Sequence, residues 1–190
     1  NAFIISSDFC HWGKAFRYTA YTPNIKDLSA VTTGLSYNQS LRDKELEEEH
    51  DWDELRNTEL VDLTSFNSKT ELKKDVTIAD SVEFLDRQGL AVLSLGDPEQ
   101  WDEYITTTKN TICGERPLSV LLNTISSARQ EKTKQSNGTS VTNGNSNSTN
   151  GVMAGDEHWG VLKWIGYKQS ERARALRDTS VSYASGFAVI

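Results

Sequence analysis

The sequence predicts an α/β fold with a central β-sheet flanked by helices, and three observations support it. Segments 161–167 and 181–189 near the carboxyl end have the composition or the alternation of β-strands. Three segments between residues 79 and 129 carry apolar side chains at helical spacing. The amino-terminal run Ala2-Phe3-Ile4-Ile5 is typical of a buried strand. With 190 residues, 36% hydrophobic and 25% charged, the chain has the size of one domain.

The first predicted helix begins near Ala79. Gly89 weakens its middle, because glycine costs about 1 kcal/mol relative to alanine inside a helix. Its apolar face nevertheless recurs at helical spacing, with Val82, Leu85, Leu90 and Leu93.

Two further helices have local start signals. Asp97 suits an N-cap and Pro98 a first helical position, so a helix is expected from there to about Thr108. Pro117 opens another helix, expected to end near Arg129. The apolar stripe of this last helix is Leu118, Leu121, Leu122 and Ile125.

Two segments interrupt this pattern. Residues 22–78 have few apolar repeats, and positions 41–60 hold nine acidic against three basic residues, so an acidic, solvated insertion is expected there. Residues 130–158 are rich in Asn, Ser, Gly and Thr, which predicts a disordered surface insertion because such side chains cannot bury enough apolar area to offset chain ordering.

Composition also excludes classes of function. The net charge of -7 argues against nucleic-acid binding, which needs clustered Lys and Arg. No apolar run approaches the roughly 18 residues of a membrane span. Two cysteines in unlike settings give no disulfide framework, which favours a reducing, cytoplasmic location, with the nucleus as a second compartment.

The amino end suggests that the chain is a fragment. It opens with Asn1, and its only methionine is Met153. A buried strand at a terminus usually has neighbours on both sides. We therefore expect residues 1–190 to be the carboxyl-terminal part of a larger single domain.

Asp8 and His11 form the first candidate site. They are three residues apart after the predicted first strand, and a tight turn could bring the carboxylate and the imidazole to one pocket as base, orienting group or ligands. The alternative is that Asp8 caps the following turn and His11 is hydrogen-bonded within it. Cys10 between them is expected to pack as a small hydrophobic residue.

Cys113 is the second candidate. It lies just before the Pro117 helix, where helix-start amides can stabilise a thiolate that binds metal or reacts. The alternative is a buried structural cysteine. Arg116 could bind an anionic group or pair with a surface acid. His50, in the acidic segment, and His158, after the Asn/Ser-rich segment, are expected to be exposed and receive no role.

Three blocks resemble the Memo family, named for mediation of receptor-driven cell motility. The first runs from Phe3 to Gly13 and includes Ser6-Ser7-Asp8-Phe9-Cys10-His11-Trp12. The second is Asn110-Thr111-Ile112-Cys113-Gly114, and the third spans 178–186. Together with the helix from Ser81 through Asp97-Pro98, which also resembles the family's, they cover the chain apart from the two insertions, and the Asn/Ser-rich insertion is in keeping with a fungal member.

The resemblance implies a fold similar to LigB-type class III extradiol dioxygenases, with a pocket where those enzymes hold nonheme iron. In the Memo family this pocket contains groups matching Asp8, His11 and Cys113, together with two histidines from an amino-terminal part that the present sequence lacks. The family is associated with iron or copper binding, with redox signalling and with phosphotyrosine peptides. A thiolate ligand differs from the two-His-one-carboxylate shell of the dioxygenases, so extradiol ring cleavage is not expected to carry over.

Two functions that use the pocket therefore compete, and a third hypothesis is a folded scaffold whose pocket is a vestige of an ancestral enzyme. One is a metal-binding protein with a redox or signalling role, in which Cys113 is a ligand and His11 a weaker candidate. The other is a nonenzymatic adaptor that binds phosphotyrosine or acidic peptides in the same pocket and acts in cell motility or cytoskeletal signalling.

Overall fold

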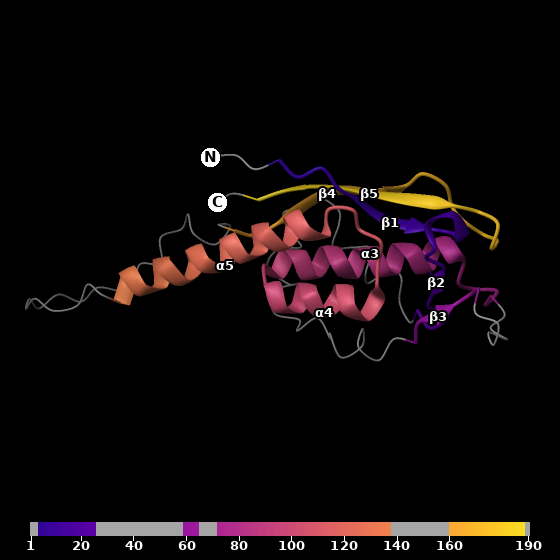
Figure 1. The fold of residues 1–190 in the computed structure, drawn as a ribbon, viewed down its shortest axis with the longest axis horizontal. Coiled ribbons are helices and arrows are strands. Elements are labelled where there is room, and N and C mark those ends of the chain that lie inside the picture. The colour runs from indigo at the N-terminus through magenta and orange to yellow at the C-terminus, as the bar shows by residue number, and fades with distance from the viewer. Residues whose placement is uncertain (1–3, 26–58, 65–71, 138–159, 189–190) are drawn as a thin grey trace, which may run out of the picture.

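The computed structural model describes residues 4–25, 59–64, 72–137 and 160–188 (Figure 1). Strands β1, β5 and β4 form an antiparallel sheet in that order, and β2 pairs antiparallel with β3. The elements in chain order are β1 (Asp8–Trp12), the 3-10 helix η1 (Lys14–Phe16), β2 (Ala20–Tyr21), β3 (Val61–Asp62), α3 (Ile78–Leu95), α4 (Pro98–Thr108), α5 (Glu115–Asn137), β4 (Lys163–Gln169) and β5 (Ser180–Phe187). The predicted α/β class is confirmed.

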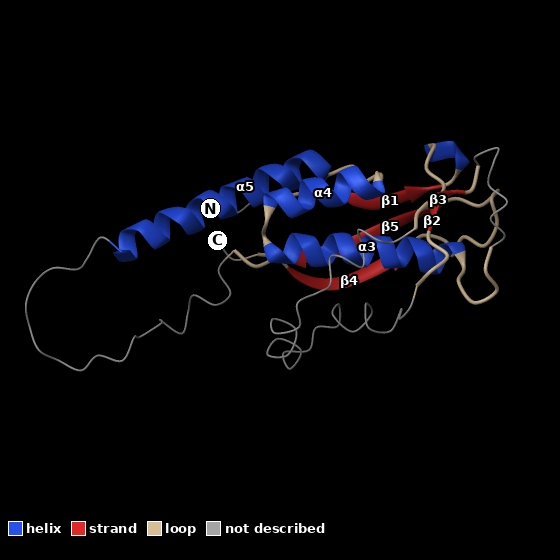
Figure 2. Cartoon of the chain, turned by 90° about the horizontal axis from the view of Figure 1, so that it is seen from below, coloured by secondary structure: helices blue, strands red, loops and turns tan. Residues whose placement is uncertain are grey.

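The three α-helices of the described chain lie on one face of the three-stranded sheet (Figures 1 and 2). Helix α3 packs against β1 and β4, and α4 packs against α3 and α5. The carboxyl-terminal half of α5 extends beyond the other two helices (Figure 1). The main core fills the space between helices and sheet, and its largest fully buried members there are Trp101, Tyr104, Leu90, Leu93, Leu122 and Ile125.

Helix α3 has well-defined ends. Thr77 and Asp80 form a capping box, in which the Thr77 hydroxyl accepts the Asp80 amide and the Asp80 carboxylate accepts the Thr77 amide. Gly96 ends the helix in the left-handed region, with φ of 69°. Gly89, the weak point in the sequence pattern, faces the Tyr104 ring so closely that a Cβ there would lie 2.8 Å from it. The glycine therefore lets α4 approach α3.

The predicted starts of α4 and α5 can be compared with the structure. Helix α4 spans the predicted residues, and the Asp97 carboxylate accepts the Glu99 and Gln100 amides. Helix α5 begins two residues before Pro117 and continues to Asn137, so the predicted end near Arg129 is wrong. The extension is rich in Gln, Glu and Lys, which favour helix even where no apolar stripe remains. Residues 138–158 of the Asn/Ser-rich segment lie outside the described residues.

The predicted amino-terminal strand is also corrected. Ile4 is 95% exposed, Ile5 is half-buried, and β1 begins only at Asp8. The buried side chains of this region come later, from the segment Phe9–Trp12. Residues 1–3 of the predicted strand lie outside the described residues.

Strand β5 alternates as predicted, but its small polar side chains face the helices. Ser180 and Ser182 are buried, whereas Tyr183 and Phe187 are exposed. Ile165 of β4 is exposed as well. The inward serines leave room for the polar contacts described below.

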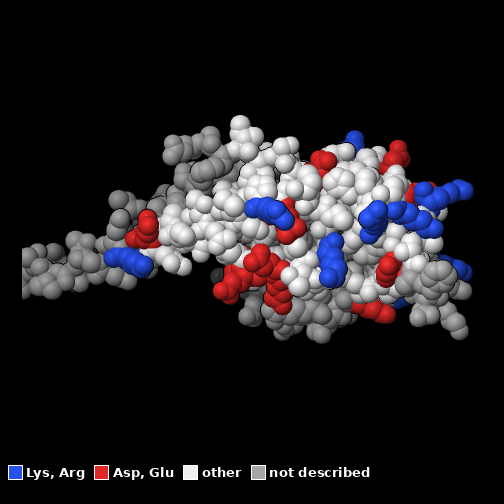
Figure 3. All heavy atoms as spheres, in the orientation of Figure 1, with Lys and Arg blue, Asp and Glu red and all other residues white. Residues whose placement is uncertain are grey.

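Only parts of the predicted acidic insertion are described. Within 22–78, β3 pairs with β2, and the Tyr21 hydroxyl donates to the Val76 carbonyl. Residues 26–58 and 65–71 lie outside the described residues. On the face drawn in Figure 3, acidic and basic side chains are interspersed, with Lys and Arg more frequent at the end opposite the projecting α5. No helix within the described ranges is long and apolar enough to cross a membrane.

Candidate functional site

A β-bulge in β1 places Asp8 beside His11. Asp8 is opposite Tyr183 and His11 is opposite Val181, so Phe9 and Cys10 together face Ser182. Residues three apart in a regular strand point to opposite faces, and the extra residue of the bulge returns them to the same side. The Asp8 carboxylate and His11 Nε2 are 3.6 Å apart. The predicted proximity is therefore found, although a bulge within the strand produces it rather than a turn after the strand.

Thr111 holds the His11 residue from the other side. The Thr111 hydroxyl accepts the His11 amide (2.8 Å) and donates to the His11 carbonyl (2.9 Å). His11 Nδ1 lies 2.9 Å from the Thr111 carbonyl oxygen. A carbonyl oxygen can only accept, so Nδ1 carries the proton in this contact. In the neutral ring the lone pair is then on Nε2, the nitrogen that faces Asp8.

Cys113 joins the same group through Asp8. The Cys113 amide donates to the Asp8 carbonyl (3.2 Å), and the Asp8 amide donates to Cys113 Sγ (3.1 Å). Ser7 adds a contact on the same side, because its hydroxyl accepts the Gly114 amide (2.9 Å). A Cβ on Gly114 would lie 2.3 Å from Ser7, so glycine is needed for this close approach. The segment before α5 is thereby fixed to the start of β1.

The alternatives left by the sequence can now be compared with the structure. Cys113 is exposed, so the interpretation as a buried structural cysteine is wrong. Cys10 is fully buried, as predicted, and burial raises the pKa of its thiol well above the usual value. Arg116 is exposed in the first turn of α5. His50 and His158 lie outside the described residues.

The donor atoms suit a transition metal in type but form an incomplete set. His11 offers Nε2 while Nδ1 is held by a carbonyl, which is the usual arrangement of a metal-binding histidine. Cys113 offers an exposed sulfur, and the Asp8 side chain is 45% exposed. Across the described ranges, however, no three His, Cys, Asp or Glu side chains are close enough together to hold an ion. A metal here would need ligands from elsewhere.

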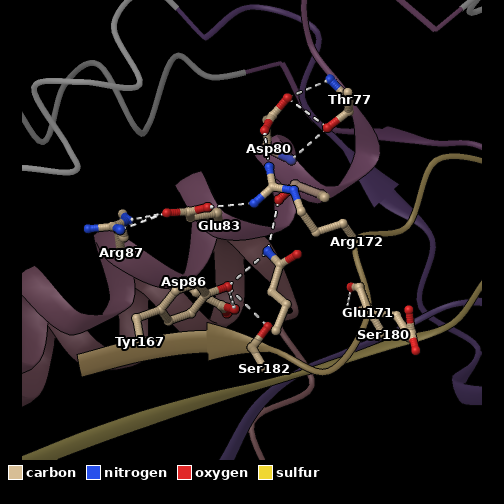
Figure 4. Close-up of polar contacts among 12 residues, drawn as sticks. Thr77, Asp80, Glu83, Asp86, Arg87, Tyr167, Glu171, Arg172, Ser180 and Ser182 are labelled. Atoms are coloured by element: carbon tan, nitrogen blue, oxygen red, sulfur yellow. Dashed lines mark hydrogen bonds and ion pairs between the residues drawn. The ribbon is translucent and has the colours of Figure 1, made fainter.

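The sequence analysis missed a buried carboxylate behind this site. Asp86 of α3 is fully buried, and its side chain points from the helix toward Tyr167 and Ser182 of the sheet (Figure 4). Its carboxylate accepts the Tyr167 hydroxyl (2.8 Å) and the Asn110 side-chain amide (2.8 Å). The Ser182 hydroxyl and the Cys10 backbone amide also donate to it. One carboxylate therefore links α3 to β1, β4, β5 and the segment after α4.

Burial raises the pKa of the Asp86 carboxyl to about 6, because desolvation disfavours the charged form more than its hydrogen bonds favour it. Burial, and then the nearby Asp86 charge, also raise the pKa of the Tyr167 hydroxyl. The sequence did hold a signal for this network. Asp86 follows Leu85 and precedes Leu90 by four positions, so it is a charged residue within the apolar face of a predicted helix.

A second polar group lies near the start of α3. Arg172, in the β4–β5 connection, donates to the Asp80 carboxylate (2.6 Å) and lies 3.6 Å from Glu83, which also pairs with Arg87 (Figure 4). These contacts attach the connection to α3. They do not involve Asp8, His11 or Cys113.

Comparison with known proteins gives one consistent result. The family model described as Memo-like protein matches residues 1–187. The chain is 30% identical to the MEMO1 family protein MHO1 of Saccharomyces cerevisiae, with all of this chain and 43% of that protein aligned. It is 28% identical to Protein MEMO1 of Xenopus laevis, over all of this chain and 39% of that protein, and 27% identical to Protein MEMO1 of Homo sapiens, over 98% and 37%. The chain thus spans about two fifths of the length of these relatives.

Proposed function

The chain belongs to the Memo-like protein family, and from this premise we propose that Cys113 and His11 contribute to a metal-binding pocket with a redox or signalling role. The observation that carries the proposal is the fixed tautomer of His11, whose Nδ1 donates to the Thr111 carbonyl and leaves Nε2 as the basic nitrogen beside Asp8. Sulfur and imidazole together favour iron, copper or zinc over magnesium or calcium. Iron or copper, when bound, would supply one-electron redox chemistry.

Each residue has a separate part in this proposal. The Cys113 sulfur is the anionic ligand, and the Asp8 amide that donates to it fixes its direction. His11 binds through Nε2. The Asp8 carboxylate lies 3.6 Å from that nitrogen, where it completes the site or orients a bound water. The remaining ligands come from the part of the family's chain outside residues 1–190, as two histidines of a LigB-like domain. Extradiol ring cleavage is not part of the proposal.

Metal uptake tests it. The full-length protein is purified without added metal, and iron, copper and zinc are measured by elemental analysis before and after dialysis against each ion. We expect near-stoichiometric iron or copper in the wild type, and loss of most of it in Cys113→Ala and His11→Ala. Cys10→Ala is the thiol control, and His50→Ala and His158→Ala are the histidine controls. A wild-type protein that neither contains nor takes up iron or copper overturns the proposal.

A second candidate function, an adaptor for phosphotyrosine or acidic peptides, is favoured by a different observation. The His11 ring packs edge-on against the exposed Phe16, with ring centroids 5.2 Å apart, and Lys14 and Arg17 are exposed on the same turn. The aromatic ring of a phosphotyrosine could pack against Phe16 while its phosphate accepts from Arg17 and, when the imidazole is protonated, from His11 Nε2–H.

The Asp8 carboxylate distinguishes the two functions. As a ligand or orienting group it favours a cation, whereas it repels a phosphate. Asp8→Asn is therefore expected to lower metal affinity if the metal proposal holds. It is expected to raise the affinity for a phosphotyrosine peptide, measured by fluorescence anisotropy, if the adaptor function holds. An unphosphorylated peptide of the same sequence is the control.

A further inference from the structure

Among the described contacts Asp86 makes no hydrogen bond to Asp8, His11 or Cys113, yet its hydrogen bonds reach both segments that carry these residues. We propose that Asp86 is a positioning residue, which through Asn110 and the Cys10 amide holds β1 and the Cys113 segment so that His11 Nε2 and Cys113 Sγ serve one pocket. The inference deepens the proposed function and rests on it for the identity of the pocket. Its geometry can be tested without any metal.

The first link runs through Asn110. Its side-chain amide donates to the Asp86 carboxylate and to the Tyr104 hydroxyl, both at 2.8 Å, so both amide hydrogens are used. Tyr104 in turn donates to the Leu85 carbonyl of α3. Asn110 is 4% exposed and immediately precedes Thr111, which makes the three contacts to His11. Asp86 therefore holds Asn110, the residue next to Thr111, on which the orientation of His11 depends.

The second link runs through the bulge. Two residues of β1, Phe9 and Cys10, face the single residue Ser182, and a bulge leaves one residue outside the regular ladder. A buried amide without a partner would cost about 1–3 kcal/mol. The Asp86 carboxylate accepts the Cys10 amide, and the Ser182 hydroxyl donates to the same carboxylate. Asp86 thus supports the irregularity that brings His11 to the side of Asp8.

Two properties, the tautomer of His11 and the reactivity of Cys113, distinguish a positioning role of Asp86 from a role in stability alone. A carboxylate that only stabilised the core could be lost without changing the tautomer of His11 or the reactivity of Cys113 in molecules that remain folded. A positioning residue must change both, because the Thr111 carbonyl and the Asp8 amide move with the segments that it holds.

The test measures these two properties in the full-length protein without added metal. NMR of the 15N-labelled imidazole nitrogens reports the His11 tautomer, and the rate of alkylation by iodoacetamide under native conditions reports the Cys113 environment. In Asp86→Asn, whose side chain places an amide among the donors, we expect His11 to lose its single Nδ1–H form. We also expect the Cys113 alkylation rate to change by about fivefold, as an altered hydrogen bond to sulfur of about 1 kcal/mol implies.

Tyr21→Phe is the matched control. It removes a buried hydroxyl that donates to the Val76 carbonyl and has no contact with Asn110 or His11 among those described. It is expected to lower stability while leaving the tautomer and the alkylation rate at their wild-type values. Asn110→Ser is the second variant, since it removes only the first link and leaves Asp86 its other donors. It is expected to change both readouts in the same direction as Asp86→Asn.

The proposal is overturned if either folded variant of this pair, Asp86→Asn or Asn110→Ser, keeps the wild-type tautomer and alkylation rate. If Asp86→Asn does not fold, Asn110→Ser alone decides. The metal proposal fails separately, by absence of metal uptake in the wild type, and that result leaves both metal-free readouts valid. A loss of metal affinity by about tenfold or more in Asn110→Ser, as is usual for residues that orient ligands, would connect the two.

Discussion

His11 and Thr111 are joined by three hydrogen bonds, two through the Thr111 hydroxyl and one through its carbonyl. The hydroxyl bonds to the His11 amide and carbonyl, as the backbone of a neighbouring strand would. The carbonyl accepts from Nδ1 and so selects the ring tautomer. The two functions of Thr111 can therefore be separated by changing its side chain alone.

Thr111→Val removes the hydroxyl and retains the shape of the side chain. We expect it to lower the free energy of unfolding by about 1–3 kcal/mol, because the His11 amide and carbonyl lose their partner in a half-buried position. Urea denaturation measures this. Thr111→Ser keeps the hydroxyl and is expected to lose less than half as much. Equal stability of the valine and serine variants would contradict the role given to the hydroxyl.

The two cysteines are expected to differ in reactivity. Cys113 is exposed and Cys10 is fully buried with a raised pKa, and the thiolate is the reactive form. Under native conditions one thiol per chain should therefore react rapidly with a thiol reagent, and both should react in denaturant. Peptide mapping identifies the labelled residue. Rapid labelling of Cys10 in the native protein would show that β1 is not packed as described.

The pH dependence of the free energy of unfolding should show the contribution of the buried Asp86 carboxyl. Its pKa is raised by burial to about 6 in the folded protein and is near 3.8 when unfolded, so the folded state holds the extra proton between these values. Stability from this group is thus complete below about pH 4 and falls as the pH rises toward 6, with a maximal slope of about 1.4 kcal/mol per pH unit. Asp62 and Asp178 have lowered pKa values and act in the opposite sense, at more acidic pH.

Comparison of the unfolding free energies of the wild type and Asp86→Asn isolates the contribution of the Asp86 carboxyl. The difference in unfolding free energy between wild type and Asp86→Asn is expected to decrease from pH 4 to pH 6 and to level off above pH 7. The other ionisable groups are the same in both proteins, so their effect largely cancels. A difference that increases with pH over this range would mean that hydrogen bonding outweighs desolvation at Asp86.

Gly89→Ala should destabilise the protein even though alanine favours helix by about 1 kcal/mol. A Cβ at this position would lie 2.8 Å from the Tyr104 ring, and crowding of this kind costs about 1–3 kcal/mol. Thermal denaturation should therefore show a lower Tm. In a double-mutant cycle, Tyr104→Leu should reduce the penalty of Gly89→Ala. A rise in Tm in the single variant would show that α4 can shift away without cost.

Local signals allowed much of the helical layer to be predicted from the sequence. Asp97 as the N-cap and Pro98 at the first helical position indicate where α4 starts, and the predicted span of this helix is confirmed. The predicted end of α5 near Arg129 is too early, because the apolar stripe stops near Ile125 while the helix-forming composition continues. The prediction of a buried strand over residues 2–5 is wrong at Ile4, because an apolar run does not by itself show what covers it.

Only part of the candidate site could be predicted from the sequence. The spacing of Asp8 and His11 suggested their proximity, and the structure places them together. The contact of Asp8 with Cys113 joins residues more than a hundred positions apart, and only the family resemblance pointed to it. The position of Asp86 on the apolar face of a predicted helix indicated a buried carboxylate, but its donors come from four other segments, which no local pattern could specify.

The bulge in β1 changes how the spacing of polar residues is to be understood. In a regular strand the inward and outward positions alternate. The bulge adds one residue between Asp8 and His11, so the alternation shifts by one position there. Insertion or deletion of a single residue between them would therefore turn the imidazole to the opposite face of the sheet while leaving the composition of the segment almost unchanged. The number of residues between Asp8 and His11 therefore decides whether their side chains share one face of the sheet.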